Sequence, residues 1–187
     1  MSHNAVPLSH HRLVAVSRSA LDALRRSLLR DGDAGAATAL REAGYAAGEG
    51  HVAALGDWVR ERRGVAPNQL SLEQFSEDAS AYFSELGWGA MHVTSLDDAV
   101  VAVDAPDWWE SAGQEQTGRP ECHLTTGMLA ALFQSVAGAE LGVLEVECRS
   151  AGDARCRFLV GAGDVLAYVH DAMTHGTAYR DALARVE

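Results

Sequence analysis

The three cysteines of this chain, Cys122, Cys148 and Cys156, fall in its second half together with Glu145. Twenty-two residues separate Cys122 from Glu145, two separate Glu145 from Cys148, and seven separate the last two cysteines. Thiolates and a carboxylate are ligands that Zn²⁺ accepts in a tetrahedral shell, and four protein ligands leave no position for a reacting water. The pattern therefore predicts a zinc ion that holds structure together.

Buried free cysteines are the alternative explanation of the same residues. Cysteine is among the most buried residue types, so three thiols packed in an apolar core need no metal. Two features favour the metal. Cys148 and Cys156 are predicted on paired strands either side of a short turn, and Cys122 precedes a predicted helix, whose dipole favours a thiolate.

The carboxylate ligand is open between two residues. In a regular strand Glu145 and Cys148 point to opposite faces, so Glu145 can join the thiols only if the strand contains a bulge or a twist. Glu147 is the alternative ligand. Three thiolates and a carboxylate leave a zinc site with a net negative charge, and the arginines that flank the cysteines are expected to offset it: Arg149, Arg155 and Arg157.

Composition excludes two classes of partner. The chain has 26 acidic and 15 basic residues, a formal net charge of −11, and no run of lysine or arginine. Phosphate binding needs a basic footprint, so nucleic acid is not an expected partner. No apolar stretch approaches the ~20 residues that cross a bilayer, and residues 1–11 lack the apolar core of a signal peptide. These features predict a cytoplasmic protein without membrane association, whose thiols stay reduced.

Apolar periodicity predicts three helices in the first half, over residues 17–30, 33–63 and 71–86. Gly44 and Gly48, one turn apart in the second helix, allow a neighbouring backbone to come close.

Capping residues mark two of the helix starts. Ser17 or Ser19 can cap the first helix, and Ser71 followed by Gln74 is a capping box for the third. The first helix carries an apolar stripe at helical spacing: Leu21, Leu24, Leu28 and Leu29.

The second half alternates between strand and helix patterns. It predicts two hairpins, a helix capped by Thr125 or Thr126, and a long terminal helix, over residues 91–95 with 99–103, 127–137, 141–149 with 155–160, and 164–186. This order predicts an α+β fold with an antiparallel sheet. We expect residues 1–70 to form an N-terminal helical region that dimerises, and residues 71–187 to form a ligand-binding domain with the zinc site.

The segment 121–160 resembles a known family, the 4-vinyl reductase domain. Three cysteines, a glutamate and a Gly-Asp turn agree with the family in order and spacing, and upstream Gly87-Trp88-Gly89 and the Gly44/Gly48 pair agree more loosely. The matching runs are Cys122-His-Leu-Thr-Thr-Gly127, Gly138, Leu144-Glu-Val-Glu-Cys148-Arg-Ser-Ala-Gly-Asp153 and Cys156-Arg-Phe158.

The resemblance implies a fold similar to the ligand-binding fold of NO-signalling proteins and of Golgi transport-particle subunits. In the phenol-sensing bacterial activators that carry this domain, the matching residues bind a zinc that supports the sensor pocket. Carried over, this implies zinc ligands at Cys122, Glu145, Cys148 and Cys156. It also implies a module that binds a hydrophobic, aromatic or tetrapyrrole molecule as a sensor or carrier. The activators continue into an ATPase and a DNA-binding domain that this sequence lacks, so an effector protein in trans is a possible partner.

Two other functions are open. The first is an enzyme or accessory protein of (bacterio)chlorophyll vinyl reduction, and the second is a scaffold or assembly protein. The sequence contains no Gly-x-Gly-x-x-Gly nucleotide cradle and no Gly-x-Ser-x-Gly or His-Glu-x-x-His motif. Binding is therefore favoured over catalysis.

A bound ligand is expected in an apolar pocket with a few polar groups, lined by aromatic residues of the middle region. Each candidate could instead pack in the core. Trp108 and Trp109 are adjacent, so in an extended segment only one of them can point inward. The candidates are Phe75, Tyr82, Trp88, His92, Trp108 and Phe133.

Self-association is also expected. The apolar stripe of the first helix extends beyond what one small sheet can cover, and the resemblance implies pairing through N-terminal helices. We expect a homodimer with twofold symmetry.

Overall fold

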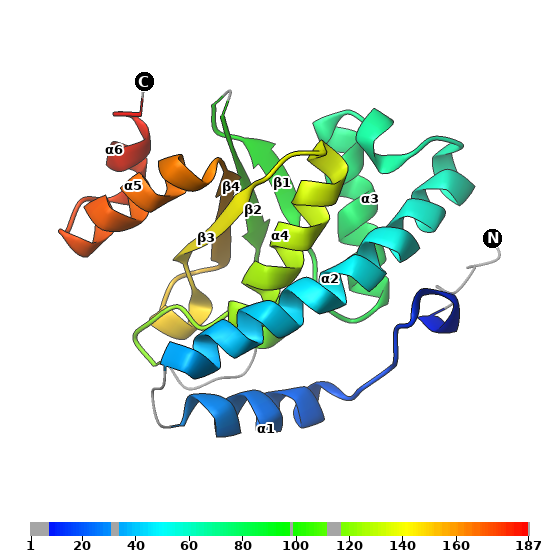
Figure 1. Cartoon of the computed structure of the whole chain (residues 1–187), viewed down its shortest axis with the longest axis horizontal. Helices are drawn as coiled ribbons and strands as arrows, with labels where there is room; N and C mark the ends of the chain where they lie inside the picture. The colour runs from blue at the N-terminus through cyan, green and yellow to red at the C-terminus, as the bar shows by residue number, and fades with distance from the viewer. Residues whose placement is uncertain (1–7, 31–33, 98, 112–116, 187) are drawn as a thin grey trace.

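The computed structural model describes residues 8–30, 34–97, 99–111 and 117–186. Its centre is a four-stranded antiparallel sheet with strand order β1-β2-β4-β3, which confirms the predicted α+β fold (Figure 1). In chain order the elements are η1 (Leu8–His11), α1 (Arg18–Leu29), α2 (Ala34–Arg63), η2 (Pro67–Gln69), α3 (Leu72–Glu85), β1 (His92–Ser95), β2 (Val100–Ala105), η3 (Trp109–Ser111), α4 (His123–Ala137), β3 (Gly142–Glu147), η4 (Arg149–Ala151), β4 (Cys156–Gly161), α5 (Gly163–Thr174) and α6 (Tyr179–Leu183).

The sheet is covered on both faces. Val103 and Phe158 pair across β2 and β4 and pack into the main core with α2, α3 and α4. Their neighbours Ala102 and Leu159 face the other way and form a smaller core with α5 and α6. This alternation is what a strand pair buried on both sides requires. Among the described residues, no helix is both long and apolar enough to cross a membrane.

Two predicted helix starts are confirmed. The Ser17 side chain accepts a hydrogen bond from the backbone N–H of Ala20 and caps α1. Ser71 and Gln74 form the predicted capping box of α3. The predicted start of the second helix at Asp33 lies outside the described residues, and the described helix runs from Ala34.

Three predicted element bounds are wrong. Helix α4 starts at His123, because Cys122 rather than a threonine is its N-cap. The strand predicted to reach residue 149 ends at Glu147, since the chain turns into η4. The terminal helix predicted over 164–186 divides into α5 and α6, because Gly176 takes a left-handed conformation with φ of 86°.

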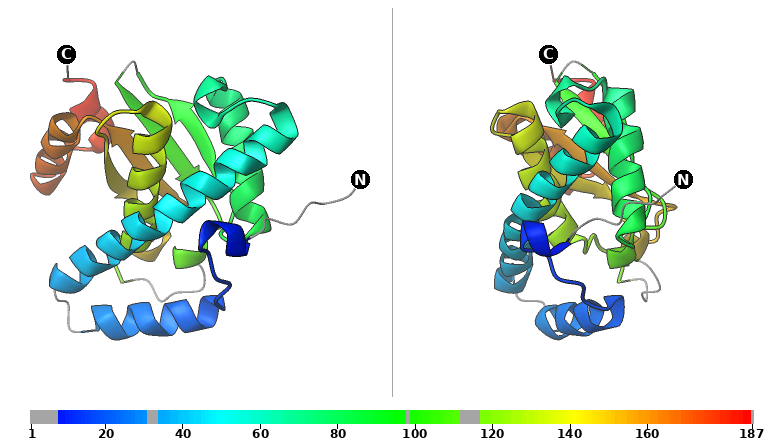
Figure 2. Two further views of the ribbon diagram at one scale, coloured as in Figure 1. Left: turned by 45° about the vertical axis from the view of Figure 1, so that its right-hand side comes forward. Right: turned by 90° about the vertical axis from the view of Figure 1, so that its right-hand side faces the viewer.

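Helices α2 and α4 cross at close range, as the glycine pair predicted. A β-carbon on Gly44 would stand 2.0 Å from the carbonyl oxygen of Leu124, and one on Gly127 would stand 1.9 Å from that of Arg41. Only glycine fits between backbones this close. Helix α2 thereby holds α4 against the sheet, while α1 runs below α2 on the side away from the sheet (Figures 1 and 2).

We expect Gly127→Ala to lower the free energy of unfolding by at least ~3 kcal/mol, because its methyl group would meet a backbone oxygen that cannot move aside. Gly56→Ala in α2 is the matched control. Its β-carbon would lie 3.5 Å from the nearest atom, in the flexible Arg60 side chain, so helix propensity should make it neutral or stabilising by up to ~1 kcal/mol. Denaturant unfolding of both variants checks this, and equal effects would contradict the close crossing.

Candidate functional site

The three cysteine sulfurs meet at one buried point. Cys122 caps α4, Cys148 follows β3 and Cys156 opens β4. The Sγ of Cys122 lies 3.8 Å from that of Cys148 and 3.6 Å from that of Cys156, and the last two sulfurs are 3.9 Å apart. A disulfide would hold two of them at ~2.05 Å. The thiols are therefore free neighbours, each in a residue with no exposed surface.

A bulge in β3 brings Glu145 to the thiols. The pairing of β3 with β4 shifts by one residue between Glu145, opposite Phe158, and Glu147, opposite Arg157. This irregularity is the one that the sequence required for Glu145 to reach the cysteines. Glu147 instead faces the outer side of the sheet, where its Oε1 accepts a hydrogen bond of 2.6 Å from the Tyr179 hydroxyl.

The donor atoms of Cys122, Glu145, Cys148 and Cys156 all lie within 4.8 Å of one another. Glu145 Oε2 accepts a hydrogen bond of 3.0 Å from the backbone N–H of Cys122. Its Oε1 is buried and makes no hydrogen bond to any described residue. An unsatisfied buried carboxylate oxygen is costly, so this atom fits a ligand position better than a purely structural one. The four residues could hold one metal ion.

The four acidic groups oppose one another's ionisation. Burial raises the pKa of Glu145 to about 9, and hydrogen bonding with Cys148 raises the pKa of Cys122 well above its usual value. Hydrogen bonds from the other two thiols lower the pKa of Cys148. The protein by itself thus favours one charge shared among four donors, whereas a divalent cation would favour the ionised form of all of them.

Hydrogen bonds from neighbouring loops fix the cluster. Asp153 Oδ2 accepts from the backbone N–H of Cys148 at 2.7 Å, which closes the turn between β3 and β4. The Cys156 thiol lies 3.2 Å from the Ser111 hydroxyl of η3. The Gly-Asp turn of the family pattern therefore shapes the site directly.

Sequence reasoning missed Glu110, which is fully buried beside the cluster. Its carboxylate accepts hydrogen bonds from the backbone N–H groups of Leu124 and Thr125 at 3.0 and 2.8 Å, and from the Thr125 hydroxyl at 2.6 Å. Trp108 Nε1 donates to the same threonine oxygen at 2.7 Å. Burial raises the pKa of Glu110. An acid after two tryptophans gave no sign of burial, since only the docking of η3 onto α4 creates it.

The predicted role of two flanking arginines is wrong. Arg155 and Arg157 pair with Asp104 on the outer face of the sheet, because alternation along β4 turns them away from the thiols. Buried positive charge comes instead from Arg25 of α1. Its side chain is 2% exposed and donates to the carbonyl oxygen of Glu121 at 3.3 Å, next to Cys122.

The predicted pocket residues do not share one cavity. Phe75, Tyr82, Trp108 and Phe133 are buried in the main core, and His92 is exposed. Trp109 is buried beside Trp108, against the prediction that only one would point inward, because the chain turns into η3 at that point.

Trp88 does line an apolar cavity of about 370 Å³, between residues 12–21 and the aromatic cluster. His51, explained from the sequence as a satisfied helix residue, also lines it. Its Nδ1 is hydrogen-bonded to the Tyr82 hydroxyl at 3.0 Å, and its ring meets that of Trp88 edge-on at 5.2 Å. The remaining walls include Leu13, Leu21, Trp109 and Leu124.

A sequence profile of the 4-vinyl reductase domain matches residues 107–162. This stretch runs from the residue before Trp108 to the end of β4 and contains all four clustered donors. The chain carries a 4-vinyl reductase domain. The family resemblance seen in the sequence is thereby confirmed, and a search of curated protein sequences gives no significant match.

Three solved structures share the fold of this 4-vinyl reductase domain chain. The phenol-responsive sensory domain of the transcription activator PoxR, solved with phenol, has a TM-score of 0.62 at 18% identity, over 89% of this chain and 83% of that one. A vinyl-4-reductase family protein from Methanocaldococcus jannaschii has 0.54 at 17%, over 83% and 88%. A trafficking protein particle complex subunit 3 from Naegleria fowleri, covalently bound to palmitic acid, has 0.53 at 15%, over 77% and 91%. At these identities the likeness shows the fold.

His51 gives the chain a measurable pH dependence. Burial lowers its pKa from 6.5 to about 4. As the pH falls below 6.5, the unfolded state binds a proton that the folded state refuses, so stability present above pH 6.5 is lost. The loss amounts to ~2 kcal/mol by pH 5. We expect His51→Gln to lack this component, measured as the difference between wild type and variant in unfolding free energy at pH 7 and pH 5. An unchanged pH slope in the variant would contradict a buried neutral imidazole.

Proposed function

We propose that this chain is a zinc-containing module that binds a small apolar or aromatic molecule and acts as a sensor or carrier. The observation that carries the proposal is the position of the aromatic cavity beside the buried Cys-Glu cluster. Leu124 lines the cavity and lies two residues from Cys122, in the first turn of α4. A metal that fixes this helix start would also fix one wall of the cavity.

The spacing of the sulfurs supports zinc. A tetrahedral site with Zn–S distances of ~2.3 Å has sulfur–sulfur edges of ~3.8 Å. The three edges here are 3.8, 3.6 and 3.9 Å. The partnerless Glu145 Oε1 supplies a fourth donor. Thiolate-rich donor sets select zinc over the hard cations magnesium and calcium.

The zinc would act on structure rather than on a substrate. Cys122, Glu145, Cys148 and Cys156 fill a four-coordinate shell, and bound zinc supplies charge compensation and a fixed link between them. The residues themselves set the geometry: the β3 bulge aims Glu145, the Asp153 turn holds Cys148, and α4 presents Cys122.

We expect protein purified without chelator to hold one zinc per chain, and Cys156→Ser to lower the melting temperature by at least ~10 °C, because structural zinc binding is largely folding free energy. Ser150→Ala is the matched control. Ser150 is also buried near the site, and its hydroxyl makes no hydrogen bond to a described residue. Thermal melts with metal analysis check both. A Cys156→Ser protein that melts like wild type would exclude the structural role.

The cavity suits a small ligand with an apolar body. Its walls combine the Trp88 and Trp109 rings with leucines, and burial keeps the His51 imidazole neutral at pH 7 by lowering its pKa. A neutral imidazole can accept or donate one hydrogen bond, which would orient a ligand hydroxyl. PoxR, whose sensory domain shares the fold, responds to phenol. Phenol and indole are therefore suitable first probes.

We expect phenol or indole to shift the indole N–H resonances of Trp88 and Trp109 saturably, and Trp88→Ala to weaken binding at least ~5-fold with its zinc retained, since an aromatic contact is worth ~1 kcal/mol or more. Trp58→Ala is the control, because Trp58 packs on Tyr82 outside the cavity. Equal affinity of wild type and Trp88→Ala would place the ligand elsewhere. Consumption of an added reductant with a bound substrate would instead favour an enzyme.

Pairing of two copies through the N-terminal helical region is part of this proposal. The α1 stripe is only partly covered in the single chain, where Leu24 and Leu28 are 59% and 41% exposed. Arg25 on the same helix is buried against Glu121, so α1 is anchored while its outer face stays open. A dimer through α1 would place the cavity-lining Leu21 close to the partner. It would offer a route from ligand binding to an effector protein in trans.

A further inference from the structure

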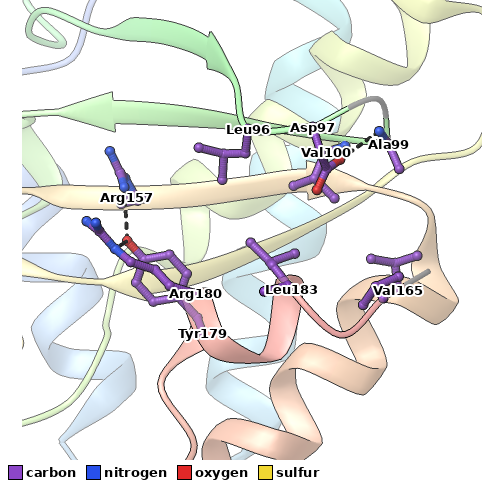
Figure 3. A pocket seen from close by; sticks show the side chains of 11 residues that line it. Leu96, Asp97, Ala99, Val100, Arg157, Val165, Tyr179, Arg180 and Leu183 are labelled. Atoms are coloured by element: carbon purple, nitrogen blue, oxygen red, sulfur yellow. Dashed lines mark hydrogen bonds between the residues drawn. The ribbon is translucent and has the colours of Figure 1, made fainter.

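A second cavity lies on the opposite side of the sheet from the zinc candidate. It is an open groove of about 660 Å³ between strands β2 and β4 and the C-terminal helices α5 and α6. Much of its wall comes from residues 163–186, beyond the segment that matches the family profile. Figure 3 shows it from close by. Nothing in the proposed function uses it.

Charge is distributed along the groove from one end to the other. Figure 3 shows Arg157, Tyr179 and Arg180 together at one end and Asp97 at the other. The Asp97 carboxylate accepts hydrogen bonds of 2.7 Å from the backbone N–H groups of Ala99 and Val100 and is thus occupied in holding the turn.

The middle of the groove is apolar. Val100 and Val165 lie there with Leu183, and Val100 and Leu183 belong to the small core between the sheet and α5–α6. Groups that are apolar along the centre and charged at one end match an amphiphile. The volume lies in the range of small-molecule sites.

The cationic end carries unbalanced positive charge. Three guanidinium groups, from Arg155, Arg157 and Arg180, face two carboxylates, those of Asp104 and Glu147. This leaves one positive charge in a chain whose net charge is −11.

The inner part of this network is already paired. Arg157 binds both Asp104 oxygens at 2.6 Å and donates to the Tyr179 hydroxyl at 2.9 Å, and that hydroxyl in turn donates to Glu147. The outer arginine is held less closely. Arg180 lies 3.9 Å from Glu147, and its side chain is 68% exposed at the groove.

We propose that this groove is a second ligand site, for a small monoanionic amphiphile: a carboxylate with an apolar tail. The carboxylate pairs with Arg180 and completes the charge balance of the network. The tail lies over Val100 and Leu183. Asp97 at the far end disfavours the reversed orientation, because two carboxylates would then face each other.

Sodium octanoate is the probe, with 1-octanol as its neutral analogue of equal chain length. We expect octanoate to shift the backbone amide resonances of residues 96–100 and 179–184 saturably at pH 7, and octanol to bind at least ~5-fold more weakly. We expect Arg180→Gln to weaken octanoate ~3- to 10-fold and leave octanol unchanged, since a largely exposed charge pair contributes modestly. Arg185→Gln, an exposed arginine of the same terminal segment outside the groove lining, should bind like wild type.

A second variant tests the tail position. Ala184 lines the groove and is exposed, so Ala184→Trp should fill the groove without entering the core and abolish the octanoate shifts. Three results would overturn the proposal: equal affinity for octanol and octanoate, no effect of Arg180→Gln, or shifts confined to the surroundings of Trp88 and Trp109. The last result would leave the cavity of the proposed function intact. Conversely, phenol that fails to bind there has no bearing on octanoate in the groove.

Discussion

The meeting of three thiols and a carboxylate at one buried point is the interaction on which the rest of the chain depends. It joins the first turn of α4 to both strands of the β3–β4 hairpin. These segments are far apart in sequence, so their junction constrains how the helix docks on the sheet. Four acidic groups with almost no solvent repel one another unless they share protons or a cation. The same point is therefore either the tightest link in the fold or its weakest.

Helix α4 also connects the two halves of the chain. Glycines at its crossing with α2 let the backbones touch, and the residues of α2 that face inward join the same core as the sheet. The N-terminal region is thus integrated with the domain that follows it. Arg25 extends this integration to α1, whose guanidinium reaches Glu121 beside the cluster. The apolar cavity lies where these N-terminal segments meet Trp88 and Trp109.

A single bulge in β3 serves both faces of the sheet. Without it, Glu145 and Glu147 would lie on one face, because side chains two apart in a strand point the same way. With it, Glu145 joins the thiols and Glu147 joins Tyr179 and the arginine network outside. The chemistry of the inner cluster and that of the outer groove are therefore set by the same local irregularity, although the two sites have opposite charge.

The sequence by itself determined the elements whose signals are local. Caps at Ser17 and Ser71 marked helix starts, glycine spacing predicted the close crossing, and cysteine spacing with the family pattern selected the four donors. Only the tertiary structure decided which carboxylate meets the thiols, that both tryptophans are buried, and that the last helix breaks at Gly176. Those outcomes depend on strand register and on where a segment docks. Contacts between residues distant in sequence set both, and no local pattern of residues records them.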